Sequence, residues 1–455
     1  MTPLPRRTLL IAASLLPLAL TTPSRAAPLA PALLREDLAQ FRHAVLRRHP
    51  RWHGHERLDD DAEAAFAEAD AALQAAPAPG LSRQAAFALM SRVNPALRDA
   101  HTLLMPWLDG RAPDAALQRR LFPFGVELGA DGALRLRSHW RHADGRVLAA
   151  GTGILNVNGV PADALLDRLA AHSHGETPRL RRHMLGLMWA EWLHAVPGWR
   201  DRFTVVLDDG RTLALDAASP WTATRVTPQT PSLDWPVPDV ALLRVPSLDV
   251  DEAPEAFANA VAGAYAALRS RPTRALLVDL RGNTGGQSDA AEVVMRPLLD
   301  RPVALVSRAR ERLNQDNRGW FGWRGPAGAM REIDLAREGR VEPLPPPLRW
   351  SGRTAVLIDE MSYSATILLA AALRDHGRAT LIGRPTGGHA NQTGNMMPSR
   401  LPHSGFVAFV ATRTFVRPSG DPAEQPLRPD ITVTAADPHR DPVLQAAIGW
   451  ARSTG

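Results

Sequence analysis

The chain has 455 residues, of which 45% are hydrophobic and 22% charged, a composition typical of globular proteins with more than one domain. Cysteine is absent, which excludes disulfides, thiolate metal sites and a cysteine nucleophile. Lysine is absent too, so all 53 basic residues are arginines and no lysine can act as a catalytic base or phosphate clamp. The net charge of +6 is small, and the arginines are interspersed with acids, which argues against a nucleic-acid surface.

Residues 1–26 are typical of a secretory signal peptide. A basic start at Arg6 and Arg7 is followed by an apolar run from Leu9 to Leu20 and by small residues ending at Ala26. We therefore expect cleavage near Ala26, a periplasmic or secreted mature protein, and no stable insertion into a membrane. The paired arginines also fit a twin-arginine signal, and an anchor that stays attached is the alternative.

Residues 31–108 are predicted to form an N-terminal helical region. Apolar side chains recur at helical spacing from Leu34 to Leu46, and an alanine-rich and acidic helix is expected over 60–76. Ser82 is placed to cap a third helix over 84–93.

Residues 120–217 have a different pattern, in which short apolar segments alternate with glycine and asparagine turns. Strands are predicted at 124–128, 134–136, 153–159, 203–207 and 212–215, and a helix at 161–171. The Asp-Asp-Gly sequence at 208–210 predicts a hairpin between the last two strands. This region is therefore expected to be a small, mostly β module.

Residues 225–448 alternate between strands and helices. Unbroken apolar strands are predicted at 240–245, 275–280, 355–358 and 379–382, and helices at 253–268 and 365–375. Such alternation predicts an α/β core with a parallel or mixed sheet. The proline-rich segment 301–350 is expected to be irregular, as in a lid or a binding loop.

The first chemical candidate is the loop Asp-Leu-Arg-Gly-Asn-Thr-Gly-Gly at 279–286, directly after a buried strand. Ligands bind beyond the carboxyl ends of strands in open α/β sheets, and consecutive glycines let backbone N–H groups approach a ligand. An ordinary tight turn is the alternative. A phosphate loop is disfavoured because the chain has no lysine.

The second candidate is Ser364, between a buried strand and the first turn of an apolar helix. A helix N-terminus favours developing negative charge, which suits a nucleophile whose attack creates an oxyanion. The alternative is that Ser362 or Ser364 simply caps the helix. Because both loops leave parallel-type strands, they should meet at one sheet edge and supply a hydroxyl and free amides, two parts of an acyl-transfer site.

A serine nucleophile needs a base, and two of the 15 histidines stand out. His101 lies in the sequence Asp-Ala-His-Thr, and His389 follows a Gly-Gly pair. An acid that orients the imidazole could be Asp99, Asp421 or Glu424.

These motifs resemble the carboxyl-terminal processing (tail-specific) serine proteases. The loop 279–286 is similar to that family's Asp-Leu-Arg-Gly-Asn-x-Gly-Gly loop, and Ser364 with the segment 382–388 matches its nucleophile region in order and spacing. The early segment 99–102 and the late Arg-Pro-Asp-Ile at 428–431 also match, so the likeness covers most of residues 31–448.

The resemblance implies a serine peptidase that acts on protein or peptide substrates and needs no cofactor or metal. It implies a ClpP/crotonase-like α/β catalytic core over 225–448, with the region 120–217 as a PDZ-like β module. Ser364 would be the nucleophile, and the amides of Gly285 or Gly286 and of Ala365 would form the oxyanion hole.

The sequence departs from many members at the general base. Those members use a Ser–Lys dyad, and His389 stands where the lysine would be. A second branch, which includes the tricorn core protease, uses an early histidine and a late acid, which His101 and Glu424 match. We favour His101 as the base and keep His389 as the second candidate. A non-catalytic ligand- or peptide-binding protein on the same scaffold is the alternative function.

Overall fold

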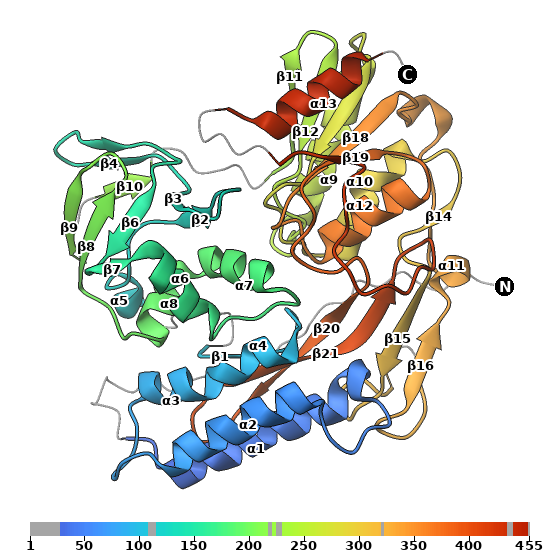
Figure 1. Ribbon diagram of the computed structural model, residues 1–455. Helices are drawn as coiled ribbons and strands as arrows, with labels where there is room; N and C mark the ends of the chain where they lie inside the picture. The colour runs from blue at the N-terminus through green and yellow to red at the C-terminus, as the bar shows by residue number, and fades with distance from the viewer. Residues whose placement is uncertain are drawn as a thin grey trace.

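The computed structural model describes residues 28–107, 115–216, 221–223, 230–319, 323–434 and 440–453. The predicted signal peptide lies outside these ranges. Figure 1 shows helices from the N-terminal part at one end, an α/β core at the other, and a mostly β region beside both. None of the described helices is both long and apolar enough to cross a membrane.

The N-terminal helices predicted from the spacing of apolar residues are present in the structure. The helices are α1 (Pro31–Arg48), α2 (Asp60–Gln74) and α3 (Arg83–Met90), and the hydroxyl of Ser82 accepts the N–H of Ala85 as a cap. A short helix α4 (Asn94–Leu97) and a strand β1 (Leu103–Met105) follow. The strand was not expected, because it pairs with β21 (Val407–Val416), a partner that no local pattern reveals.

The region after β1 is built from short strands and helices. Its strands are β2 (Val126–Leu128), β3 (Leu134–Leu136), β4 (Trp140–His142), β5 (Val147–Leu148), β6 (Ile154–Val157), β7 (Val160–Pro161), β8 (Arg202–Leu207), β9 (Thr212–Asp216) and β10 (Trp221–Ala223). Its helices are α5 (Ala115–Gln118), α6 (Ala162–Ala170), α7 (Pro178–Met184) and α8 (Trp189–Ala195). The predicted hairpin is present as β8–β9. The description of this region as PDZ-like stays a prediction.

The α/β core contains a six-stranded sheet. Its order is β11 (Ser232–Val237), β12 (Val240–Arg244), β13 (Ala275–Asp279), β18 (Arg353–Ile358), β19 (Thr380–Gly383) and β22 (Ile431–Thr432). All neighbours are parallel except β11 and β12, which confirms the predicted mixed α/β core. Apolar residues of α9 (Pro254–Arg269), α10 (Ser288–Met295) and α12 (Ala365–Asp375) pack on one face. Those of α13 (Pro442–Arg452) pack on the other.

The segment 301–350 is more regular than expected. It contains β14 (Val303–Ala304), β15 (Arg308–Arg312), β16 (Met330–Ile333), α11 (Leu335–Glu338) and β17 (Arg340–Val341). The sequence did not predict β15, because the strand is rich in charged residues. Its Glu311 is buried all the same, because it forms an ion pair with Arg413 of the neighbouring β21. A role as a lid remains untested.

A second sheet joins the two ends of the molecule. The strands β20 (Gln392–Arg400) and β21 form a long antiparallel hairpin, and β1 and β15 pair with the other side of β21. Figure 1 shows this hairpin running from the α/β core toward the N-terminal helices. It therefore brings segments from opposite ends of the chain to the same place.

Candidate active site

The loops after β13 and β18, residues 279–286 and 359–365, are called here the nucleophile side. The two strands are parallel neighbours that pair Asp279 with Leu357, so both loops leave the same edge of the sheet. The N–H of Tyr363 donates to the carbonyl of Asn283 at 3.0 Å, and the Ser362 hydroxyl donates to the carbonyl of Leu280 at 2.8 Å. These bonds hold the two loops together as one unit.

Ser364 has the strained backbone and uncommitted hydroxyl expected of a nucleophile. Its backbone lies at φ 55° and ψ −126°, a strained conformation for a residue with a side chain. The residue is half-buried and precedes α12, yet its hydroxyl makes no capping bond to the helix. The hydroxyl of Ser362 is held by the carbonyl of Leu280 instead. The capping alternative therefore does not account for either serine.

Two backbone amides near Ser364 have no acceptor among the described contacts, those of Gly286 and Ala365. The N–H of Gly285, by contrast, already donates to Oδ1 of Asn283 at 2.9 Å. Gly285 has a φ of +100°, and a Cβ there would lie 2.7 Å from the Cβ of Ser364. The close approach of the two loops thus requires glycine at position 285, while Gly286 and Ala365 have amides available for an oxyanion.

His101 reaches the nucleophile from the loop before β1. Its Nε2 lies 3.2 Å from Oγ of Ser364, and its ring stacks on Tyr363 with centroids 5.1 Å apart. Burial lowers the pKa of His101, although the charge of Asp99 opposes this shift. The imidazole is therefore neutral near pH 7 and able to accept a proton.

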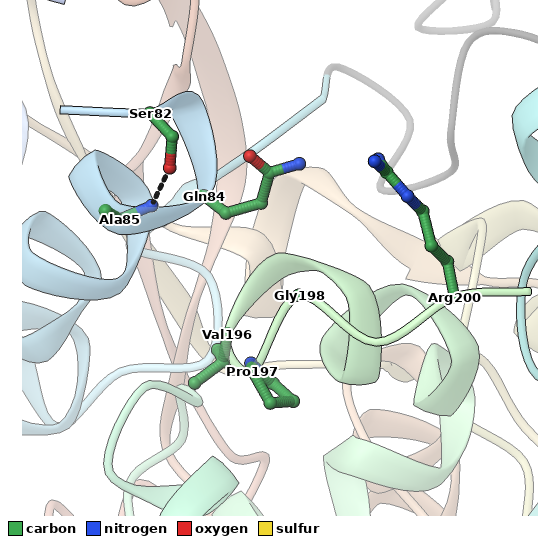
Figure 2. Close-up of a pocket in the computed structure, with 7 residues that line it drawn as sticks. All are labelled: Ser82, Gln84, Ala85, Val196, Pro197, Gly198 and Arg200. Carbon is green, nitrogen blue, oxygen red and sulfur yellow. Dashed lines mark hydrogen bonds between the residues drawn. The ribbon is translucent and has the colours of Figure 1, made fainter. Parts of the chain in front are cut away.

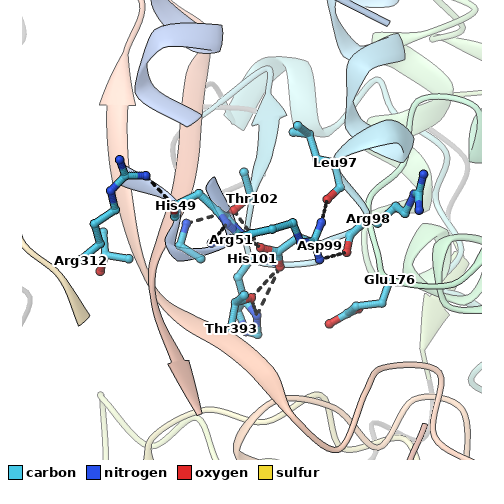
Figure 3. Close-up of polar contacts among 12 residues, drawn as sticks. His49, Arg51, Leu97, Arg98, Asp99, His101, Thr102, Glu176, Arg312 and Thr393 are labelled. Carbon is cyan, nitrogen blue, oxygen red and sulfur yellow. Dashed lines mark hydrogen bonds and ion pairs between the residues drawn. The ribbon is translucent and has the colours of Figure 1, made fainter. Parts of the chain in front are cut away.

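We call His49, Asp99, His101, Thr102 and Thr393 the base side. The buried carboxylate of Asp99 accepts four hydrogen bonds, from Nε2 of His49 at 2.6 Å, the His101 N–H at 2.8 Å, and the hydroxyls of Thr102 at 3.0 Å and Thr393 at 2.7 Å. Figure 3 shows this cluster gathered around Asp99.

Asp99 is the fixed negative charge of the base side. Burial alone would raise its pKa, but the hydrogen bond and charge of His49, with the charge of His101, hold the pKa of Asp99 well below its usual range. The nearest Asp99 oxygen lies 4.0 Å from Nδ1 of His101. Asp99 thus acts on the imidazole across a gap rather than through a direct bond.

The other candidate residues lie elsewhere in the site region. His389 forms an isolated β-bridge with Pro426, and the charge of Glu424 acts on it. Neither His389 nor Glu424 is among the described contacts of the His101 ring, which are Ser364, Tyr363 and Thr393. Asp421 accepts the N–H of Ala423 and likewise has no described bond to His101.

Several residues of the site were missed in the sequence. Tyr363 lies beside the nucleophile, and its hydroxyl lies 3.0 Å from Nδ1 of His101 and donates to Oε1 of Glu176 at 2.9 Å. The run His-Ser-His-Gly-Glu at 172–176 is rich in titratable groups and could have been noticed. Thr393 and His49 carry no sequence signal, because only the tertiary structure places them against Asp99.

The described residues contain no group of three or more His, Cys, Asp or Glu side chains arranged to hold a metal ion. A cavity of about 370 Å³ opens elsewhere, near the start of α3 and the segment after α8 (Figure 2). Its lining residues are Ser82, Gln84, Ala85, Val196, Pro197, Gly198 and Arg200. None of them belongs to the nucleophile side or the base side.

Comparison with known proteins identifies a protease family in part of the chain. Residues 239–433, which include Ser364 and the glycine loop, match peptidase family S41. The chain carries a peptidase family S41 domain. It is accordingly a serine-type peptidase. This finding favours the serine peptidase over the non-catalytic binding protein considered from the sequence.

Solved structures similar to this chain extend the likeness beyond the S41 domain to most of the chain. Mature CPAF has 17% sequence identity and a TM-score of 0.63, with 88% of this chain and 92% of that chain covered. Mature CPAF complexed with lactacystin has 18% identity and a TM-score of 0.62, with 88% and 94% covered. The photosystem II D1 C-terminal processing protease has 16% identity and a TM-score of 0.48, with 89% and 93% covered. No curated protein sequence matches the chain significantly. At these identities the two CPAF structures show a shared fold.

Proposed function

We propose that this S41 peptidase is exported and hydrolyses peptide bonds through an acyl-enzyme, with Ser364 as nucleophile and His101 as general base. The observation that carries the proposal is the 3.2 Å separation between Oγ of Ser364 and Nε2 of His101. A base must lie within hydrogen-bond reach of the proton that it removes, and this distance meets that requirement. The proposal follows the branch of the family that uses an early histidine.

Acylation begins when Oγ of Ser364 attacks the carbonyl carbon of the scissile peptide bond. The C–O bond forms, the Oγ proton moves to Nε2 of His101, and the carbonyl π pair moves to the oxygen. The amides of Ala365 and Gly286 hold this oxyanion, and the N-terminus of α12 favours its negative charge. The C–N bond then breaks, and the leaving amine takes the proton from Nε2.

Deacylation repeats these steps with water. A water molecule attacks the acyl carbon and gives a proton to Nε2 of His101. The bond to Oγ of Ser364 breaks, the serine regains the proton from Nε2, and the new carboxylic acid leaves and loses its remaining acidic proton to solvent. The base side supports both steps, because the fixed charge of Asp99 stabilises the imidazolium that forms each time.

Export is the second part of the proposal and rests on the pattern of residues 1–26. The substrates would then be proteins or peptides outside the cytoplasm. N-terminal sequencing of protein recovered from the periplasm and from the medium tests this part. A mature chain that begins near Ala27 is expected, and an unprocessed chain confined to the cytoplasm would contradict it.

A fluorophosphonate probe tests the nucleophile. We expect intact-mass analysis of the purified mature protein to show one adduct, and peptide mapping to place it on Ser364. The variant Ser364→Ala should not react. The matched control Ser270→Ala removes an exposed hydroxyl at the end of α9 and should react like the wild type.

Hydrolysis of a denatured protein substrate, followed by mass spectrometry of the products, tests the activity itself. New peptide termini should appear with the wild type and with Ser270→Ala but not with Ser364→Ala. Labelling at another serine, or hydrolysis that survives in Ser364→Ala, would overturn the assignment of the nucleophile.

A further inference from the structure

Glu176 lies behind the proposed base, in the loop between α6 and α7 and outside the residues that match the S41 family. Its Oε1 accepts the hydroxyl of Tyr363 at 2.9 Å, and that hydroxyl lies 3.0 Å from Nδ1 of His101. The other oxygen, Oε2, is shielded from solvent and has no partner among the described residues. Figure 3 shows the Glu176 side chain beside the Asp99 cluster. A continuous path therefore runs from Glu176 through Tyr363 and His101 to Ser364.

Two hydroxyl groups face Nδ1 of His101, and their polarity decides which imidazole nitrogen carries the proton. The hydroxyl of Thr393, 3.3 Å from Nδ1, donates to the carboxylate of Asp99 and so presents a lone pair to the ring. This arrangement suits a proton on Nδ1 and leaves Nε2 free to accept from Ser364. Since Asp99 stays ionised, the polarity of Thr393 is fixed.

The second hydroxyl is not fixed in this way, because its partner can titrate. We propose that Glu176, acting through Tyr363, is a positioning residue that sets the tautomer of His101 and thereby switches its competence as a base. The proposal rests on the proposed function of His101 and Ser364. An ionised Glu176 can only accept, so Tyr363 must donate to it and offer Nδ1 a lone pair. A protonated Glu176 can donate to Tyr363, whose hydroxyl then donates to Nδ1 and leaves the proton of His101 on Nε2, facing Ser364.

The surroundings of Glu176 raise the pH at which its carboxyl group ionises to slightly above neutral. Burial, and then the negative charge of Asp99, raise the pKa of Glu176 to about 8. A backbone hydrogen bond, the hydrogen bond from Tyr363 and the charge of Arg51 oppose this shift. Burial, followed by the charges of Glu176 and Asp99, raises the pKa of Tyr363 well above its usual value, so the phenol stays protonated. His174 of the same loop is neutral, because burial lowers its pKa to about 4.

The protonation state of Glu176 determines whether peptidase activity rises or falls with pH. Below pH 8 Glu176 is mostly protonated, and both polarities of the Tyr363 hydroxyl are allowed. As the pH rises through 8, Glu176 ionises, only the productive polarity remains, and its charge also stabilises the imidazolium through Tyr363. Peptidase activity should therefore increase across this range.

The pH dependence of kcat tests the inference in three variants. In the wild type, kcat should rise about tenfold between pH 6.5 and 9. Glu176→Gln cannot ionise and should lack this rise, with KM within about twofold of wild type. Tyr363→Phe should lack it too, and Glu176→Asp should keep a titration at a shifted pH. The matched control Glu255→Gln, an exposed carboxylate in the first turn of α9, should keep the wild-type profile.

A second measurement decides the inference without relying on hydrolysis. Ring ¹⁵N chemical shifts of histidine-labelled protein report the tautomer, and comparison with His101→Gln assigns the His101 signals. We expect the fraction of His101 that carries its proton on Nδ1 to increase, at the expense of the Nε2 tautomer, as the pH rises through about 8 in the wild type. In Glu176→Gln this transition should be absent.

The outcomes separate the two proposals. An unreactive Ser364 would defeat the proposed function, while the ¹⁵N titration would still show whether Glu176 controls His101. A tautomer that does not change with pH, or that changes equally in Glu176→Gln, would overturn the inference even if Ser364 reacts. A uniform loss of kcat in Glu176→Gln with the pH rise preserved would also overturn it, since that result indicates only a structural role.

Discussion

The nucleophile side and the base side of the site are built in opposite ways. The nucleophile side comes from two loops that follow adjacent parallel strands, and hydrogen bonds between the two loops at one sheet edge hold it. The base side is assembled from η1 (Pro50–Trp52) and its cap His49, from the loop before β1, and from β20. These pieces meet only because β1 and β20 pair with β21. Both halves need long-range pairing, but each loop of the first half follows a strand with a recognisable apolar pattern, whereas the pairing that assembles the second half has no such local signal.

The strongest test of this comparison removes the base and leaves the nucleophile side intact. His101→Ala should lower kcat by about 10⁴-fold or more, because the neutral imidazole that accepts the Ser364 proton is lost. Steady-state kinetics measure the loss, and circular dichroism checks that the fold is retained. If kcat falls less than tenfold in a folded protein, another group is the base.

A second test disturbs only the nucleophile side. Gly285→Ala places a Cβ 2.7 Å from the Cβ of Ser364 and 2.8 Å from the carbonyl oxygen of Tyr363. We expect kcat to fall about a hundredfold, because displacing a reacting group by about 1 Å costs that much. The rate of fluorophosphonate labelling should fall with it.

Gly282→Ala is the matched control for this steric clash. Gly282 also has a positive φ, +72°, but a Cβ there would meet no atom within 4 Å. Both variants should therefore lose roughly 1–2 kcal/mol of stability from backbone strain, whereas only Gly285→Ala should lose reactivity. Equal activities in the two variants would show that the close approach of the loops is unimportant.

The contrast also explains what the sequence could predict. Unbroken apolar runs predicted the strands of the core and α12. The glycines and the serine that follow two of these strands marked both loops of the nucleophile side. The hairpin β20–β21 was missed, because β20 contains Gly394 and Pro398 and few apolar residues, and an edge strand tolerates both. Without that hairpin nothing places Thr393 beside Asp99. His101 was one of two histidines singled out in the sequence, and only the resemblance favoured it over His389. Glu176 lies in a loop whose partners are distant in sequence.

A third test changes the charge of the base side with little change in shape. Asp99→Asn replaces a carboxylate that accepts four hydrogen bonds with an amide whose NH₂ group would face donors. We expect kcat to fall about ten- to a hundredfold, less than for His101→Ala because Asp99 lies 4.0 Å from Nδ1. Thr102→Val, which removes one donor on the far side of the carboxylate, serves as a milder control.

The pH dependence of folding stability gives Asp99→Asn a second readout. Because the pKa of Asp99 in the folded state is below its unfolded value of about 3.9, its carboxylate stabilises the fold at neutral pH. This contribution is lost as the pH falls below about 4 toward the folded pKa. Urea unfolding at several pH values should therefore show a smaller acid-induced loss of stability in Asp99→Asn than in the wild type. Identical losses would contradict the low pKa of Asp99.

The smallest effect is expected at His389, and it decides between the two histidines proposed from the sequence. His389 occupies the position of the lysine in Ser–Lys members, yet it has no described bond to Ser364. It forms a bridge with Pro426, and the charges of Glu424, Arg51 and Asp99 act on it. His389→Ala should therefore change kcat less than about threefold, and Glu424→Gln should behave similarly. A larger effect of His389→Ala would change the assignment of the base. A loss comparable to that of His101→Ala would place the base on the loop after β19, and the nucleophile and its base would then both come from the same sheet edge.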